Sequence, residues 1–315
     1  MPRLLIALLL SCALAAQAQY PSKPVKLVVP TGAGGGLDLV ARHLAQKLSD
    51  HWGKGVVVEN KVGAGGTIGV DSVAKAPADG YTLAVVATSF VINAAAYSKL
   101  PYDSVKDFAP VTPVTLSPLV FVASPASGVK SVNELVALMK ARPGEVNFSS
   151  TGNGGGVHLS IEMLLGLTGT KAQHIPFKGT VQAVTEVVEN RTQFTVTGIP
   201  VALPFMQSGK LRAIAVAGSR RSGAMPDVPA MTELYPDYGY NNWIGVLAPA
   251  RTPPEILSQL HGDIVKVMQT DDMRARLKVQ GDDPYTLPSA QFAALVQQEI
   301  ARYTALVKQV GVKLD

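Results

Sequence analysis

Two glycine clusters of nearly the same sequence constrain this chain most strongly: Gly-Ala-Gly-Gly-Gly at residues 32–36 and Gly-Asn-Gly-Gly-Gly at residues 152–156. Each cluster follows a run rich in β-branched or aromatic residues and precedes a segment with helical periodicity. The first N–H groups of a helix have no acceptor within the helix and carry partial positive charge, which favours an anion. The repeated strand, glycine loop and helix therefore predict two similar lobes with a cleft for a small acid between them.

The first residues are typical of a secretory signal peptide. Arg3 supplies a positive charge, residues 4–14 are almost entirely apolar, and Ala-Gln-Ala at residues 16–18 is a cleavage site. We therefore expect residues 1–18 to be a signal peptide and the mature protein to be periplasmic, because the apolar run is too short to span a bilayer. Lipidation at Cys12 is the alternative, for which the residue before the cysteine is poorly suited.

Composition excludes several classes of protein. The single cysteine lies in the predicted signal peptide, so the mature chain must rely on its core rather than on disulfides. With 315 residues and 47% hydrophobic content, the chain is long enough to bury one core or two adjacent cores. The formal charge is +5, but the basic residues are scattered and Arg220-Arg221 is the only arginine pair, so we expect no nucleic-acid partner.

Short apolar runs alternate with helical segments along the chain, which is the pattern of an α/β fold. The predicted strands cover residues 26–30, 56–60, 81–87, 146–150, 174–177, 194–197 and 211–217, with another at 243–247. The predicted helices cover residues 37–51, 67–75, 131–142 and a segment through 165, and three more end the chain, the last over 289–310.

Two helix starts carry the residue pair of a capping box, a hydroxyl residue followed three positions later by glutamate. These pairs are Ser131 with Glu134 and Thr252 with Glu255.

The absence of a linker of low complexity favours lobes joined by two chain crossings. We place these crossings near residues 120–124 and 243–249. The first lobe would then comprise residues 19–122 and 246–315, and the second lobe residues 123–245.

Nucleotide-binding spacings are not met. The pattern G-x-G-x-x-G fails at Leu37, Ile68 and Val157, and no G-x-x-x-x-G-K-S/T occurs. There is also no G-x-S-x-G elbow and no H-E-x-x-H, and the five histidines lack the spacing of metal ligands. We therefore expect no cofactor, no metal and no catalytic residue; an exported enzyme using Asp38 or His158 is the weaker alternative, since no nucleophile–base pair is visible.

Serine and threonine residues at particular positions indicate a ligand-binding site. They stand where predicted strands end or helices begin, and in open α/β sheets that edge binds ligands. Each of them alone is better explained as a helix cap, but together with three glycine loops they favour a site. These residues are Thr31, Thr67, Thr88, Ser89, Ser150, Thr151 and Thr197.

A series of short motifs in order resembles the Bug or TctC family, the extracytoplasmic solute-binding receptors of tripartite tricarboxylate transporters. The motifs are YPSKP at 20–24, GGGLDLVAR at 34–42, VVEN at 57–60, GAGGTIG at 63–69, ADGY at 78–81, LPYD at 100–103, GNG at 152–154, PFKG at 176–179, GKLRA at 209–213 and PDVP at 226–229. The resemblance covers nearly all of the mature chain.

The resemblance implies a two-lobed type II periplasmic binding protein that closes on a small carboxylate in a cleft between two α/β lobes. The implied ligands are dicarboxylic and tricarboxylic acids, acidic amino acids or aromatic acids. The implied partners are the membrane permease subunits of the transporter or, as an alternative, a sensor kinase; we expect a monomer. Together with the strand-end argument, the candidate ligand-binding residues are Thr31, Gly34, Gly35, Gly36, Asp38, Thr67, Thr88, Ser89, Ser150, Thr151, Asn153, His158 and Thr197.

The sequence departs from the family pattern at three places. Leu37 replaces a small hydroxyl residue in the first loop, Gly155-Gly156-Val157 replaces hydroxyl residues in the second, and Thr197 stands where many members carry aspartate. These departures predict a less polar pocket that lacks an acidic partner for a ligand ammonium. We therefore expect a plain or aromatic acid rather than an amino acid.

Overall fold

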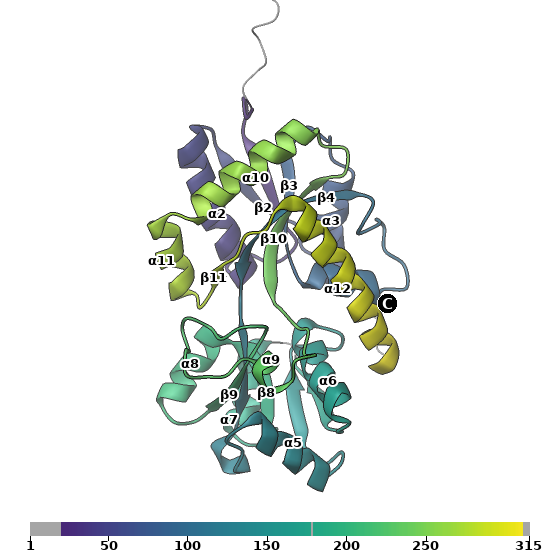
Figure 1. Cartoon of the computed structure of the whole chain (residues 1–315), viewed down its shortest axis with the longest axis vertical. Helices are drawn as coiled ribbons and strands as arrows, with labels where there is room; N and C mark the ends of the chain where they lie inside the picture. The colour runs from purple at the N-terminus through teal and green to yellow at the C-terminus, as the bar shows by residue number, and fades with distance from the viewer. Residues whose placement is uncertain (1–19, 178, 311–315) are drawn as a thin grey trace, which may run out of the picture.

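The computed structural model describes residues 20–177 and 179–310, which form two α/β lobes stacked along the long axis of the molecule (Figure 1). Each lobe has its own β-sheet with helices packed around it, so the predicted α/β fold of two lobes is confirmed. The predicted signal peptide, including Cys12, lies outside the described residues.

The sheet of the first lobe has six strands in the order β11-β4-β10-β3-β1-β2. Strands β1, β2 and β3 are parallel, whereas β10 runs antiparallel to β3 and to β4, and β11 runs antiparallel to β4. Residues 25–29 pair one to one with residues 56–60. The strands are β1 (Val25–Val29), β2 (Val56–Asn60), β3 (Thr82–Ala87), β4 (Phe108–Leu116), β10 (Trp243–Pro249) and β11 (Asp283–Pro284).

The sheet of the second lobe has five strands in the order β7-β6-β8-β5-β9. Strands β7, β6 and β8 are parallel, and β5 runs antiparallel to both β8 and β9. The strands are β5 (Leu119–Ala123), β6 (Asn147–Ser150), β7 (Gln173–Pro176), β8 (Phe194–Gly198) and β9 (Arg212–Ala217).

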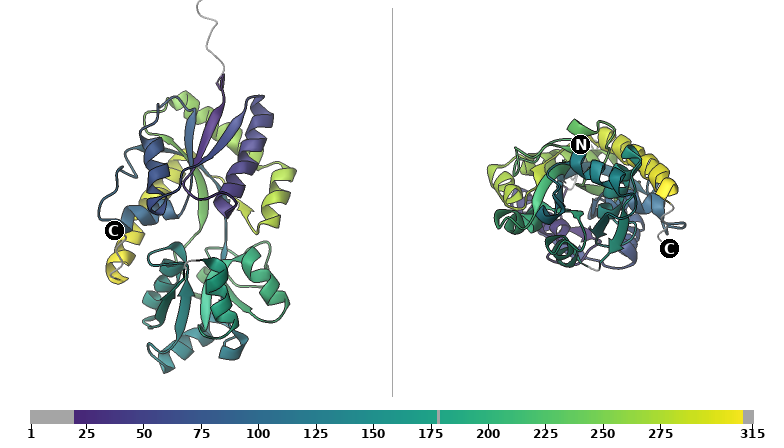
Figure 2. Two further views of the ribbon diagram at one scale, coloured as in Figure 1. Left: turned by 180° about the vertical axis from the view of Figure 1, so that it is seen from behind. Right: turned by 90° about the horizontal axis from the view of Figure 1, so that it is seen from below.

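The helices between these strands cover the faces of the two sheets (Figures 1 and 2). In the first lobe they are α2 (Gly36–Trp52), η1 (Ala64–Gly66), α3 (Thr67–Ala74), α4 (Ser89–Ala96), α10 (Pro254–Met268), α11 (Asp271–Val279) and α12 (Ser289–Val310). In the second lobe they are η2 (Pro125–Ser127), α5 (Val132–Ala141), α6 (Gly156–Thr168), α7 (Thr180–Val188), α8 (Ile199–Gln207) and α9 (Met231–Leu234).

The chain passes between the sheets at two places that lie side by side. β4 of the first sheet is followed by β5 of the second, and β10 returns to the first sheet. Ser117 and Asn242 tie the two crossings together, because the N–H of Ser117 donates to the Asn242 carbonyl and Asn242 Nδ2 donates to the Ser117 carbonyl, at 2.7 and 2.9 Å.

These pairings correct the expected crossings near residues 120–124 and 243–249, because β5 lies wholly in the second sheet and β10 wholly in the first. We propose lobe boundaries at residues 117–118 and 241–242 in place of 122–123 and 245–246.

One of the two predicted capping boxes forms its first half. The N–H of Glu134 donates to Ser131 Oγ at 3.2 Å, although the Glu134 carboxylate accepts from the N–H of Lys130 rather than from that of Ser131. The second prediction is wrong: α10 begins at Pro254, and the Thr252 hydroxyl donates to the Pro249 carbonyl. Pro254 disfavours the helical conformation for the residue before it, so Pro253 stays extended. The helix therefore starts after Pro253 rather than after Thr252.

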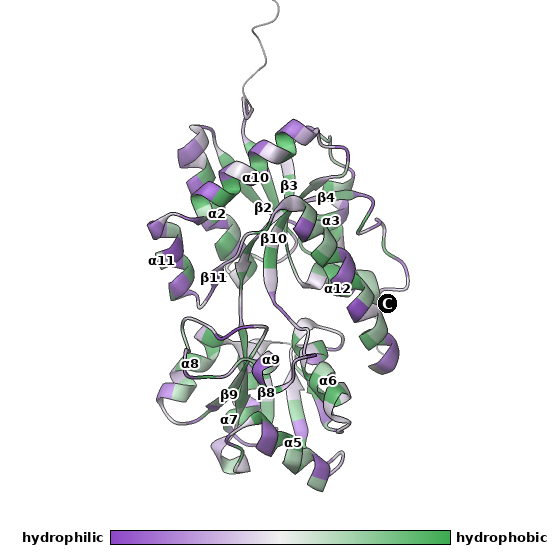
Figure 3. Cartoon of the chain, viewed as in Figure 1, coloured by the Kyte–Doolittle hydropathy of each residue, from purple (hydrophilic) through white to green (hydrophobic). Residues whose placement is uncertain are grey.

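The apolar residues gather between sheets and helices, and polar residues cover the outer helix faces (Figure 3). One cluster of buried apolar residues takes members from both lobes, including Phe90 of α4, Leu164 of α6 and Tyr303 of α12. Helix α12 packs against α4 and β4 of the first lobe and also contacts α6. The lobes therefore share a core on this side of the molecule.

Among the described residues, the search for a helix with both the length and the apolar character needed to cross a membrane finds none.

Candidate functional site

The two glycine loops enter their helices through the same backbone conformations, although Gly152 has a positive φ and Gly32 does not. Gly34 and Gly154 adopt the left-handed conformation, with φ of +83° and +69°. Gly35 and Gly155 then cap α2 and α6 in extended conformations, with φ of −77° and −71° and ψ of 165° in both. Only glycine adopts the left-handed conformation without steric cost, so the glycine pattern of the sequence encodes the loop shape.

The first loop faces open space. Residues 31–36 are exposed, and a Cβ added to Gly32, Gly34 or Gly36 would have no heavy atom within 4 Å. In Figure 2 the loop lies at the edge of the first lobe that faces the second. The N–H groups at the start of α2 can therefore reach a ligand between the lobes.

Asp38 fixes the conformation of this loop through hydrogen bonds. Its buried carboxylate accepts hydrogen bonds from the Gly34 N–H, from Arg42 Nε and from Asn60 Nδ2, each at 2.8 Å. Burial acts to raise the pKa of Asp38, but the bonds from Arg42, Gly34 and Asn60 outweigh burial and bring the pKa to about 2. Asp38 is thus an ionised positioning residue for the loop.

His158 holds the second loop in the same way. The N–H of Gly154 donates to His158 Nδ1 at 3.0 Å, again over four residues, and the ring is buried. His158 Nε2 lies 3.4 Å from Glu162 Oε1. Because Nδ1 accepts this hydrogen bond and so carries no hydrogen, the ring hydrogen lies on Nε2 and faces this carboxylate. In both loops a buried side chain accepts the N–H of the glycine four residues before it and contacts a charged side chain four residues after it. In the first loop these side chains are an aspartate and an arginine, and in the second they are a histidine and a glutamate.

A stack of rings lies under the second loop. The His158 and His174 rings are 3.9 Å apart at an angle of 12°, and Phe148 stacks on His174 at 4.9 Å. Burial, with a smaller effect of His158, lowers the pKa of His174 to about 4. His174 Nε2 lies 2.5 Å from Ser150 Oγ, which also exchanges hydrogen bonds with Gly152. Sequence spacing gave no indication of this stack, because His174 comes from the neighbouring strand.

The hydroxyl groups of two further candidate residues form hydrogen bonds within the first lobe and with the chain that crosses between the lobes. Thr88 Oγ1 donates to the Asn241 carbonyl at 2.9 Å and accepts from the Trp243 N–H at 3.0 Å. Thr67 Oγ1 donates to the Ala64 carbonyl at 2.9 Å. Both side chains are buried, so they fix the starts of α4 and α3.

The remaining candidates divide by exposure. Thr31, Thr151 and Asn153 are exposed in the glycine loops or beside them, and Ser89 is exposed at the start of α4. Thr197 is buried at the end of β8, and its Oγ1 has no hydrogen-bond partner among the described residues.

One contact across the lobes was not predicted from the sequence. A Cβ added to Gly156, the first residue of α6, would lie 2.8 Å from Tyr240 Oη and 3.9 Å from Ile92 Cδ1. Ile92 belongs to α4 of the first lobe, so the second glycine loop abuts a helix whose N-terminus carries Thr88 and Ser89. The tertiary structure thus brings the second loop and the α4 start together.

The arrangement favours binding over catalysis. Ser150 contacts a histidine, but the serine is fully buried and a base with a pKa near 4 is a poor acceptor of its proton at neutral pH. In the described part of the chain, no group of three or more histidine, cysteine, aspartate or glutamate side chains could hold a metal ion. What the site offers is hydrogen-bond donors at helix starts, held by buried side chains.

Comparison with known proteins gives one consistent result. The sequence model described as "Tripartite tricarboxylate transporter family receptor" matches residues 40–312. The chain is 37% identical to protein BugT of Bordetella pertussis over 298 residues, which are 94% of this chain and 91% of that protein.

Two similar solved structures come from Rhodopseudomonas palustris. One, with adipate, is 30% identical with a TM-score of 0.79 and covers 93% of this chain and 99% of that chain. The other, MatC with bound malate, is 31% identical with a TM-score of 0.73 and covers 91% and 100%.

Proposed function

Because the chain belongs to the tripartite tricarboxylate transporter family of receptors, as its motifs predicted, we propose that it captures a small carboxylate between its lobes and delivers it to the membrane permease of such a transporter. The proposal places the mature protein in the periplasm and assigns it no enzymatic activity. The observation that carries it is the pair of glycine loops that enter a helix through the same two backbone conformations, at Gly34–Gly35 and at Gly154–Gly155.

The ligand contacts in this proposal are mainly backbone N–H groups at the starts of α2 and α6. The exposed side chains of Thr31, Ser89, Thr151 and Asn153 supplement them, while buried Asp38 and the other buried candidates position the loops. A hydrogen bond to a charged group contributes about 1.5–3 kcal/mol. Four or five such bonds give roughly 6–15 kcal/mol before the costs of association, and micromolar affinity needs about 8 kcal/mol.

The ligand class is a plain dicarboxylate rather than an amino acid. Two similar structures contain adipate and malate, neither of which carries an ammonium group. At the end of β8 this chain has the uncharged Thr197, so this position offers no carboxylate to the ammonium group of a ligand.

The test removes one N–H group without disturbing the helix. Gly36 is the first residue of α2, where proline is tolerated, and Gly35 already has the extended conformation that a residue before proline adopts. Gly36→Pro therefore deletes a single donor, and Gly36→Ala is the matched control, because it adds a Cβ into open space and keeps the N–H.

Titration calorimetry with adipate and malate should show binding to the wild type and to Gly36→Ala. Gly36→Pro should weaken binding by about tenfold to a hundredfold, the loss of one charged hydrogen bond. Equal affinities of the two variants would refute the role of the α2 start. Tight binding of aspartate or glutamate with no response to either plain acid would refute the ligand class.

A further inference from the structure

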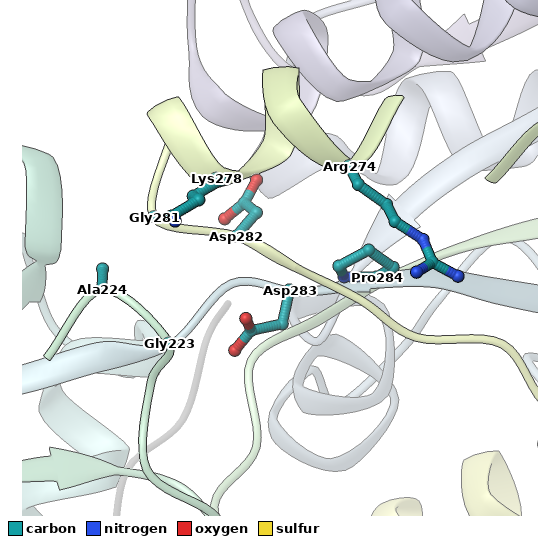
Figure 4. A pocket seen from close by; sticks show the side chains of 8 residues that line it. All are labelled: Gly223, Ala224, Arg274, Lys278, Gly281, Asp282, Asp283 and Pro284. Carbon is teal, nitrogen blue, oxygen red and sulfur yellow. The ribbon is translucent and has the colours of Figure 1, made fainter. Parts of the chain in front are cut away.

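A cavity lies between the lobes, away from the glycine loops. Its volume is about 500 Å³, and the close-up in Figure 4 shows its walls. Gly223 and Ala224 line it from the second lobe, and the end of α11 with the segment that follows lines it from the first. In the first sheet, β4 and β10 stand between β11, which is next to the cavity, and β3. In the second sheet, β5 stands between β8 and β9, the strand that precedes Gly223. The cavity is therefore separated from the glycine loops by the strands that adjoin the lobe crossings.

Four charged side chains line this cavity: Arg274 and Lys278 from α11, and Asp282 and Asp283 beside them. Within the described residues none of the four takes part in an ion pair closer than 4.0 Å, whereas the neighbouring Asp272 pairs with both Lys47 and Arg276. The lining thus presents both signs of charge without neutralising them.

The two acidic groups are poorly solvated. Asp282 is 9% exposed, and burial raises its pKa to about 7 although Ser117 donates a hydrogen bond to it. Burial also raises the pKa of Asp283, against the opposing effects of Arg220 and the N–H of Gly223. A buried carboxylate without a cationic partner is costly, and a ligand ammonium would remove that cost.

The cations of the same segment are accessible. Arg274 and Lys278 are exposed on α11, and a guanidinium group binds a carboxylate through two parallel hydrogen bonds. A single small molecule with an ammonium and a carboxylate would therefore satisfy both the acidic and the basic groups.

We propose that this cavity is a second binding site, for a small zwitterion whose ammonium group contacts Asp282 and whose carboxylate contacts Arg274 and Lys278. Gly223 and Ala224 place the second lobe against the same ligand. A ligand in this cavity would therefore contact both lobes.

The test uses the mature chain and calorimetry with matched probes. L-Alanine and 6-aminohexanoate are zwitterions with one and five carbons between the charges; adipate and 1,6-diaminohexane carry two charges of one sign. At saturating adipate, which fills the glycine-loop site, at least one zwitterion should still bind, and the diamine should bind at least tenfold more weakly than that zwitterion.

Two variants then locate the site. Asp282→Asn and Arg274→Gln should each weaken zwitterion binding at least tenfold and leave adipate binding unchanged. Arg274 is exposed, so its variant should fold even if Asp282→Asn does not. Arg276→Gln, which removes an exposed arginine of the same helix that pairs with Asp272, is the control and should change neither affinity.

Three results would overturn the proposal: no zwitterion binding, zwitterion binding that adipate abolishes, or zwitterion binding equal in wild type and Arg274→Gln. Failure of adipate to bind would instead count against the proposed function, so the two outcomes are distinguishable.

Discussion

Replacing Glu299 by glutamine should stabilise the protein at alkaline pH and have a much smaller effect at pH 5. Glu299 lies on α12 and is fully buried; its Oε2 accepts from Trp243 Nε1 at 2.6 Å, and its Oε1 has no partner among the described residues. Burial raises the pKa of Glu299 from 4.5 to about 7, against the opposing effects of the Trp243 hydrogen bond and of Arg302.

The sign of the effect follows from proton binding. Between pH 4.5 and 7 the folded state holds a proton on Glu299 that the unfolded state has released, so the free energy of unfolding falls as pH rises through this window. One pKa unit corresponds to about 1.4 kcal/mol, so the loss is complete above pH 7 and amounts to roughly 3 kcal/mol. Glutamine keeps an acceptor for Trp243 and cannot ionise, so the variant should escape this loss.

Urea unfolding at pH 5, 6, 7 and 8.5 measures the effect. The difference in free energy of unfolding between Glu299→Gln and wild type should rise from less than about 1 kcal/mol at pH 5 to roughly 3 kcal/mol at pH 8.5. Asp282, whose pKa is also about 7, titrates in both proteins and cancels in the difference. Glu145→Gln, at an exposed position, is the control and should give a difference that does not vary with pH. A flat difference for Glu299→Gln, or destabilisation at pH 8.5, would refute the reasoning.

Three further predictions concern the glycine loops and the lobe crossing. Gly156→Ala should lower affinity for the carboxylate because its Cβ would meet Tyr240 Oη, at a cost of about 1–3 kcal/mol; adding Tyr240→Phe should restore affinity in calorimetry, and no recovery would contradict the contact. Asp38→Ala should lower the free energy of unfolding by roughly 2–3 kcal/mol in urea, because the Gly34 N–H and two side chains lose a charged acceptor; Asp38→Asn should lose less, and an equal loss would show that charge is unimportant. Thr88→Val should cost about 1–3 kcal/mol, since it leaves buried hydrogen-bonding groups at the lobe crossing unpaired; an unchanged melting temperature would argue against that role.

The sequence by itself determined the loops and the helices that follow them. Glycines at 34 and 154 are needed where the backbone is left-handed, and apolar periodicity placed α2 and the whole of α12 (Ser289–Val310) within a residue of their ends. These features depend on neighbouring residues, which a linear pattern records. The motifs also identified the family correctly.

Tertiary structure alone decided what the side chains near the loops do. Asp38 and Ser150 were expected to contact ligand, but their polar atoms bond to the protein, with partners such as Asn60 and His174 that come from neighbouring strands. The lobe boundaries that we propose, at residues 117–118 and 241–242, likewise depend on which sheet each strand joins. Pairing between distant segments fixes these properties, and a short stretch of sequence carries no information about its distant partner. The sequence therefore determined that two glycine loops with matching helix starts exist, and the fold decided that different buried side chains hold them in place.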